Sequence, residues 1–352
     1  MSEQTVYLEG AYIPLSEAKI PIMDHGLLYG DGIFEGIRAY GGRVFKLDDH
    51  MKRFQSAARA INLQLPLPPD EIAEIILETC RRNNIVDGYV RLVCTRGADG
   101  LGLYPKPEAH APRLFCIAGQ VALYSDEAYR RGLKVITSHF RRNKAAILDP
   151  QIKSLNYLNN ILASIEAHRY GADEALMLNE EGVVTECTGD NVFLVKNGVI
   201  LTPPVWLGTL DGITRQSVIK ICKQLGVELR EEPFTHYNLV NADEAFLTGT
   251  AAEIIALTEL DGHKIGSGVA GEPQGFHQGT VGSTGAPALH LVTSHIFAPF
   301  SGCNTYSRNA ASSFNVTSPA TPLPILCPSN SVKAMISAAV PVRKASSALT
   351  RL

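Results

Sequence analysis

The stretch that decides the fold is QIKSLNYLNN, residues 151–160. It places one lysine, Lys153, shortly before an aromatic hydroxyl, Tyr157, within a run of amide side chains. A lysine amine can hold an aldehyde cofactor as a Schiff base, which is a form of covalent nucleophilic catalysis. The alternative is an ordinary surface lysine, because lysines are common on protein surfaces. The other motifs of the chain must decide between these two interpretations.

The composition is that of a soluble globular protein. The chain has 352 residues, of which 45% are hydrophobic and 19% charged, and it is long enough for two domains. A net charge of −3 offers no basic field for nucleic acid, and no apolar run reaches transmembrane length. The seven cysteines are scattered without a C-x-x-C pair, and the first residues lack a signal-peptide pattern. We therefore expect a cytoplasmic protein with reduced thiols, no metal site, and no nucleic-acid or membrane partner.

Hydrophobic periodicity and turn residues predict a mixture of helices and strands. Helices are expected at 47–61, from Pro69 onward, at 157–169 and at 214–225. A hairpin over 6–13 and strands at 89–94, 114–118, 133–137, 174–178, 192–196, 244–248 and 253–258 are also expected. Hairpin turns at Asn197-Gly198 and Asp261-Gly262 favour antiparallel pairing. The mixture predicts α+β domains rather than a doubly wound sheet, with domains over 1–118 and 130–272 joined by a connection over 119–129.

The composition changes after Glu272, which is the last acidic residue. Residues 273–352 contain no Asp or Glu and are rich in Ser, Thr, Ala, Pro and Gly. Such a segment cannot bury enough apolar surface to offset its chain entropy, so we expect an atypical tail of low order. A basic tail that binds a partner is a weaker alternative, because its few cations are dispersed.

Five motifs taken together resemble one known family. They are YGDGIFEGIR at 29–38, LDDHMKRF at 47–54, QIKSLNYLNN at 151–160, ECTGDNVF at 186–193 and GTAAE at 249–253. In this order they resemble the branched-chain amino-acid aminotransferases, class IV pyridoxal-phosphate enzymes of the D-amino-acid-aminotransferase fold group. The resemblance runs from about Val6 to Gly271. It implies a two-domain fold with a small α/β domain and a larger pseudo-barrel domain.

The resemblance implies pyridoxal 5'-phosphate as the cofactor and assigns residues to it. Lys153 would hold the aldehyde as a Schiff base and shuttle a proton, Tyr157 would bond the phenolic oxygen, and Glu186 would pair with the pyridine nitrogen. Arg53 would hold phosphate oxygens, and the helix start at Gly212-Ile213-Thr214 would add N–H donors. The remaining implied cofactor contacts are Leu210 and Thr250.

The resemblance also implies the substrate pocket. Tyr29 and Phe34 would wall an apolar side-chain pocket, and Arg38 is a further candidate that could instead be structural. Tyr89 and Arg91 lie two residues apart on a strand, so they share one face. In the family the arginine at the position of Arg91 binds the distal carboxylate of glutamate. The backbone of Ala251 and Ala252 would meet the substrate carboxylate.

The implied activity is reversible transfer of an amino group between L-leucine, L-isoleucine or L-valine and 2-oxoglutarate, through a pyridoxamine intermediate. Amino acids and 2-oxo acids would be the small-molecule partners, and the family implies a homodimer or a higher homo-oligomer. Two alternatives of the same fold are a D-amino-acid aminotransferase and an aminodeoxychorismate lyase. A third alternative is an inactive relative that only binds pyridoxal phosphate.

The chain departs from the family pattern after Gly268. Family members usually continue into Gly-Pro-Ile/Val-Thr and a closing helix, whereas this chain reads GEPQG at 271–275. One hypothesis is a shift of reading frame in the gene near Glu272. The degenerate codons of His277 to Val281, read one base later, permit Thr-Arg-Glu-Leu-Leu, which could begin such a helix. Resequencing the gene would decide this.

Overall fold

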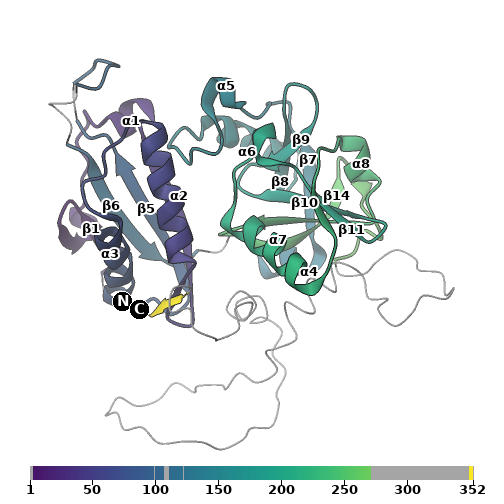
Figure 1. Ribbon diagram of the computed structural model, residues 1–352, viewed down its shortest axis with the longest axis horizontal. Coiled ribbons are helices and arrows are strands. Elements are labelled where there is room, and N and C mark those ends of the chain that lie inside the picture. Colours follow the sequence, from purple (N-terminus) through teal and green to yellow (C-terminus); the bar gives the residue numbers. More distant parts are fainter. Residues whose placement is uncertain (1–2, 99, 107–110, 122, 271–348, 352) are drawn as a thin grey trace, which may run out of the picture.

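The computed structural model describes residues 3–98, 100–106, 111–121, 123–270 and 349–351. They form two units, each built on a sheet with helices packed against it (Figure 1). Within these ranges no helix is both long enough and apolar enough to cross a membrane. The expected α+β class is confirmed.

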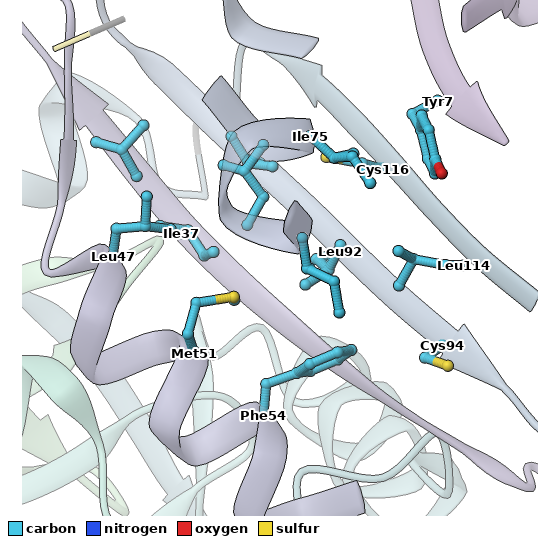
Figure 2. Packing of buried hydrophobic residues seen from close by; sticks show 14 of the residues in the cluster. Tyr7, Ile37, Leu47, Met51, Phe54, Ile75, Leu92, Cys94, Leu114 and Cys116 are labelled. Carbon is cyan, nitrogen blue, oxygen red and sulfur yellow. The ribbon is translucent and has the colours of Figure 1, made fainter. Parts of the chain in front are cut away.

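The first unit is an antiparallel sheet with the strand order β4-β3-β5-β6-β1-β2. The helices α2 and α3 pack on one face of it, because they bring apolar side chains such as Leu47, Met51 and Phe54 onto Ile37 of β3 and Leu92 of β5 (Figure 2). The elements are β1 (Thr5–Leu8), β2 (Ala11–Pro14), α1 (His25–Tyr29), β3 (Gly32–Tyr40), β4 (Arg43–Phe45), α2 (Leu47–Ala60), α3 (Pro69–Arg82), β5 (Gly88–Thr95) and β6 (Arg113–Gly119).

The second unit is a sheet that closes on itself. The strands follow the order β12-β11-β10-β13-β14-β7-β8-β9, and β9 also pairs with β10 through Glu186 opposite Asn191. The ring is therefore the expected pseudo-barrel, with its apolar core inside. Its elements are α4 (Asp126–Arg131), β7 (Leu133–Thr137), α5 (Ala145–Leu148), α6 (Leu158–Arg169), β8 (Glu174–Leu178), β9 (Val184–Cys187), β10 (Asn191–Lys196), β11 (Val199–Thr202), α7 (Ile213–Leu225), β12 (Leu229–Glu231), α8 (His236–Val240), β13 (Glu244–Gly249), β14 (Glu253–Leu260) and β15 (His263–Lys264).

The structure differs from the expected organisation in two respects. The second sheet is mixed rather than purely antiparallel, because β7 runs parallel to both β8 and β14. The expected connection over 119–129 contains the start of a helix, α4. Ser125 caps this helix by accepting a hydrogen bond from the Ala128 N–H, and acidic residues at its start and basic residues at its end suit the helix dipole.

Most of the tail, with the hypotheses of low order and of a frame shift attached to it, lies outside the described residues. Leu349–Arg351 are described and form the short strand β16. This strand pairs antiparallel with β4, with Leu349 opposite Phe45, and so adds a strand to the edge of the first sheet (Figure 1).

Candidate active site

The lysine segment lies against strand β3 of the first unit. The Phe34 N–H donates to the Lys153 carbonyl over 3.0 Å, and the Leu155 N–H donates to the Gly32 carbonyl over 2.9 Å. Position 32 requires glycine, since a Cβ there would lie 2.7 Å from the backbone carbonyl oxygen of Cys94 on β5. The backbone of Lys153 is therefore fixed at the junction of the two units.

The amine of Lys153 points at aromatic groups. Its Nζ lies 3.2 Å from the Tyr157 hydroxyl and 4.6 Å from the centre of the Phe34 ring. Burial lowers the pKa of His50 on α2, and the charge of Lys153 is among the causes that lower it further. Burial also raises the pKa of Asp190 in the second unit, and the same amine acts against that rise. Lys153 is thus within electrostatic reach of a buried group from each unit.

Glu186 is a buried carboxylate at the seam where β9 meets β10. Its Oε1 accepts a hydrogen bond from Arg142 Nε at 2.8 Å and lies 2.7 Å from Nη2 of the same guanidinium, as an ion pair. Its Oε2 accepts from the Thr209 hydroxyl at 2.8 Å, the Leu210 N–H at 2.9 Å and the Asn191 amide at 3.1 Å. A carboxylate offers about four lone-pair positions, so these four hydrogen bonds leave none of them free.

Arg142 belongs to the site although the sequence analysis missed it. It lies in the segment between β7 and α5, apart from every motif, and no spacing rule connects it with Glu186. Its side chain is only 7% exposed, and its Nη1 also donates to Asn160 on α6. Two nitrogens of this buried arginine meet the same oxygen of Glu186, which limits the orientation of the carboxylate.

Arg53 reaches from α2 toward the start of α7. Its Nε and Nη2 donate to the two oxygens of Glu35 at 2.8 and 2.7 Å, and its Nη1 donates to the Asp211 carbonyl at 3.0 Å. Burial alone would raise the pKa of Glu35, but the charge and hydrogen bonds of Arg53, helped by His50, hold it at about 2. A guanidinium has five N–H groups, so these three bonds leave two for a ligand.

The start of α7 forms the other half of an anion site beside Arg53. Ile213 and Thr214 are buried, and no described side chain caps this helix end. Glycine is required at position 212, because a Cβ there would lie 2.1 Å from the Asn191 amide oxygen. Free N–H groups at a helix start, together with an arginine that has two donors left, fit a phosphate group.

The loop 249–253 joins β13 to β14 and is held from several sides. A Cβ at Gly249 would lie 1.8 Å from an oxygen of Asp190, so only glycine fits there. The carbonyl of Ala252 accepts from the Tyr129 hydroxyl at 2.9 Å. Thr250 and Ala251 are half-buried between these two anchors.

The expected pocket residues Phe34, Tyr89 and Arg91 lie together, whereas Arg38 and Tyr29 make other contacts. Arg91 Nη2 donates to the Tyr89 hydroxyl at 3.0 Å, and its guanidinium lies 4.4 Å from the Phe34 ring that also meets Lys153. Arg38 pairs with Glu253 at 2.9 Å, while its buried Nε has no partner within the described residues. Tyr29 is exposed on α1, and its hydroxyl donates a hydrogen bond to the Leu101 carbonyl.

A pair of buried acids lies behind the loop. The Tyr124 hydroxyl lies 3.3 Å from Glu174 and 3.1 Å from Asp190, but it can donate to only one of them. Burial raises the pKa of both carboxyls, and the charge of Glu174 helps to raise that of Asp190 to about 7. Three hydrogen bonds from Thr188 and Ala175 act against the rise in the pKa of Glu174. Asp190 therefore keeps its proton to a higher pH than an exposed aspartate does.

We expect the variant Asp190→Asn to change the pH dependence of folding stability. The folded-state pKa of Asp190 lies above its ordinary value of 3.8, so wild-type stability falls as the pH rises from about 4 to about 7. The slope is at most about 1.4 kcal/mol per pH unit. Asparagine mimics the protonated acid, so the folding stability of the variant relative to that of the wild type should increase between pH 5 and pH 8. Thermal melts at both pH values test this prediction. An equal difference in melting temperature between variant and wild type at the two pH values would contradict it.

Comparisons with known proteins agree with this geometry. The family model "Amino-transferase class IV" matches residues 32–260, which is most of the chain, and the chain belongs to this family. It is similar to the putative branched-chain-amino-acid aminotransferase of Methanocaldococcus jannaschii, with 48% identity over 76% of this chain and 91% of that protein.

Two solved structures of a branched-chain amino acid aminotransferase from T.th. are also similar. The form with pyridoxamine 5'-phosphate has 38% identity and a TM-score of 0.73, over 76% of this chain and 90% of that one. The form complexed with N-(5'-phosphopyridoxyl)-L-glutamate has 39% identity and a TM-score of 0.72, over 77% and 90%. The resemblance to branched-chain aminotransferases and the cofactor that it implies are confirmed at the level of the family.

Proposed function

We propose that this protein transfers amino groups reversibly between L-leucine, L-isoleucine or L-valine and 2-oxoglutarate, with pyridoxal phosphate held by Lys153. The observation that carries the proposal is the position of the Lys153 amine. It lies beside the Tyr157 hydroxyl and the Phe34 ring, at the junction between a side-chain pocket and a buried anion site. The two T.th. complexes support both the cofactor and a glutamate-derived substrate.

The described residues fit the parts of the cofactor. Arg53, the start of α7 and Thr250 would hold its phosphate, and Tyr157 would bond its phenolic oxygen. Glu186 would meet the pyridine nitrogen beside Leu210, and one of the donors that now occupy its oxygens would give way to the ring N–H. When bound, the cofactor supplies an electron sink for charge that develops at the substrate's α-carbon. The Lys153 amine would take the proton from that carbon and return it.

The substrate would lie on the face of β3 and β5 that carries Phe34. Its apolar side chain would pack on the Phe34 ring, and Arg91 would meet a distal carboxylate when the substrate is glutamate or 2-oxoglutarate. Its α-carboxylate would face the backbone of Ala251 and Ala252, and Arg38 Nε, which has no partner among the described residues, would be a further donor. Tyr29 stays a proposed pocket residue without a described contact to this group.

The proposed location and assembly rest on two further observations. The five cysteines in the described ranges are buried free thiols, which fits a cytoplasmic protein. Helix α6 exposes Leu158, Ile161, Leu162 and Ile165 on one stripe, which fits a homodimer or a higher homo-oligomer. Light scattering of the purified protein measures the assembly.

An absorbance titration tests the function. Purified protein should change its cofactor spectrum on addition of L-leucine, and 2-oxoglutarate should then restore the starting spectrum. A response to D-alanine alone would favour a D-amino-acid aminotransferase, and consumption of aminodeoxychorismate would favour the lyase. Cofactor absorbance without a response to any of these would indicate an inactive binder.

The variant Arg91→Ala should separate the two substrate types. Loss of a charged hydrogen bond costs about 1.5–3 kcal/mol, so kcat/KM for glutamate and 2-oxoglutarate should fall roughly ten- to hundred-fold. Leucine carries no distal carboxylate, so its kcat/KM should change little. Arg81→Ala, on the exposed part of α3, is the control and should alter neither. Equal losses for both substrates would show that Arg91 is structural.

A further inference from the structure

Glu253 has a backbone conformation that its residue type rarely adopts. It directly follows the loop of Thr250, Ala251 and Ala252, and its φ is +60° although it is buried. Left-handed backbone at a residue other than glycine, asparagine or aspartate is uncommon. It persists where the surroundings determine it, and such residues often mark functional sites.

The surroundings of Glu253 come from the other unit. Its Oε1 accepts from Arg38 Nη2 at 2.9 Å and from the Tyr40 hydroxyl at 2.8 Å. The side chains of Arg38 and Glu253 are only 10% and 7% exposed. Arg38 and Tyr40 are alternate residues of β3, on the same face of the strand as Phe34. One buried carboxylate therefore joins the pocket strand to the loop.

The other anchors of the loop do not reach the first unit. Gly249 packs on Asp190, which follows β9, and Ala252 is bonded by Tyr129 of α4. Among the described residues of this loop, Glu253 is the one whose side chain hydrogen-bonds to β3. An ion pair at this depth has a narrow geometry, because each partner is costly to leave alone.

We propose that Glu253 is a positioning residue that couples the side-chain pocket on β3 to the binding of the substrate's α-carboxylate. By fixing the backbone at position 253, the pair with Arg38 sets the direction of the N–H groups of Ala251 and Ala252. It also holds Arg38, whose buried Nε has no hydrogen-bond partner among the described residues. This inference rests on the proposed function, in which the loop receives that carboxylate.

The test compares two ligands that differ only in the carboxylate. L-leucine and 3-methylbutylamine share an amine and a side chain, and the cofactor spectrum of the intact protein reports the dissociation constant of each. The variant Glu253→Gln keeps the length of the side chain and an acceptor oxygen but removes the charge. Because the variant loses a charge-assisted bond, the dissociation constant of leucine should rise about tenfold or more. The dissociation constant of 3-methylbutylamine should change little.

Three variants make the result specific. Glu253→Asn is too short to reach Arg38 but tolerates the left-handed backbone, so it should show the same selective loss even if Glu253→Gln unfolds. Tyr40→Phe removes one hydrogen bond to Glu253 but keeps its ion pair with Arg38, so it should raise the dissociation constant of leucine less than the Gln variant does. Glu259→Gln, further along β14 and partly exposed, should change neither constant.

One outcome would contradict the role of Glu253, and a different one would contradict the proposed function. Equal losses for both ligands, or none, would overturn the positioning role, because a merely structural residue gives no preference between them. Wild-type protein whose spectrum responds to neither ligand would overturn the proposed function, and this inference with it.

Discussion

Replacing Lys153 with alanine should abolish transamination while the protein stays folded. General acid–base catalysis by a positioned group contributes about 10²- to 10⁴-fold, and loss of the covalent attachment adds to that, so the rate should fall by on the order of 10⁴-fold or more. The side chain is half-buried and makes one described hydrogen bond, to Tyr157, so the cost in stability should be small. Steady-state rates and thermal melts measure the two effects.

Borohydride reduction followed by peptide mapping shows which lysine holds the cofactor. The pyridoxyl group should lie on Lys153 in the wild type and be absent from the Lys153→Ala protein. Lys144→Ala is the matched control, because Lys144 is an exposed lysine paired with Glu180 and should not affect labelling. Labelling of another lysine in the wild type would refute the assignment.

The variant Glu186→Gln should keep much of the cofactor but slow the proton transfer. A neutral amide cannot stabilise a positive ring nitrogen as a carboxylate does, and the loss is on the order of several kcal/mol, or a few powers of ten in rate. An amide would also present N–H groups to some of the four hydrogen-bond donors that now converge on Glu186. Rapid-mixing kinetics with L-leucine measures the step itself.

The control for Glu186→Gln is Glu180→Gln, in the turn between β8 and β9. Glu180 is exposed and bonds Lys144, so its replacement should leave the rate unchanged. Wild-type turnover by the Glu186→Gln protein would show that another acid pairs with the ring nitrogen.

The sequence predicts the amphipathic helices and hairpins well but not the strand on which the site is built. Helices α2 and α3 and the turn at Asn197-Gly198 agree with the prediction, because their periodicity and turn residues are local signals. All nine residues of β3 are buried, since its two faces carry different partners. Such a strand shows no alternation of apolar and polar residues, so periodicity does not predict it.

Motifs predict the candidate site residues but not the residues that support them. Lys153, Tyr157 and Phe34 lie together in the structure, and their chemical roles stay predictions. Arg142 and the bond between Arg38 and Glu253 join residues far apart in the chain, and no local pattern encodes such a pair. Sequence reasoning on a single chain finds groups with distinctive neighbours and misses those defined only by the fold.

The seam at Glu186 and Asn191 ties the chemistry to the mechanical integrity of the barrel. The Asn191 amide donates to Glu186, and its oxygen limits position 212 to glycine at the start of α7. Any fluctuation that parts β9 from β10 would therefore disorient the acid and disturb the anion site at once. Amide hydrogens along this seam should exchange only on global unfolding, which would make the site one of the last parts of the molecule to soften with temperature.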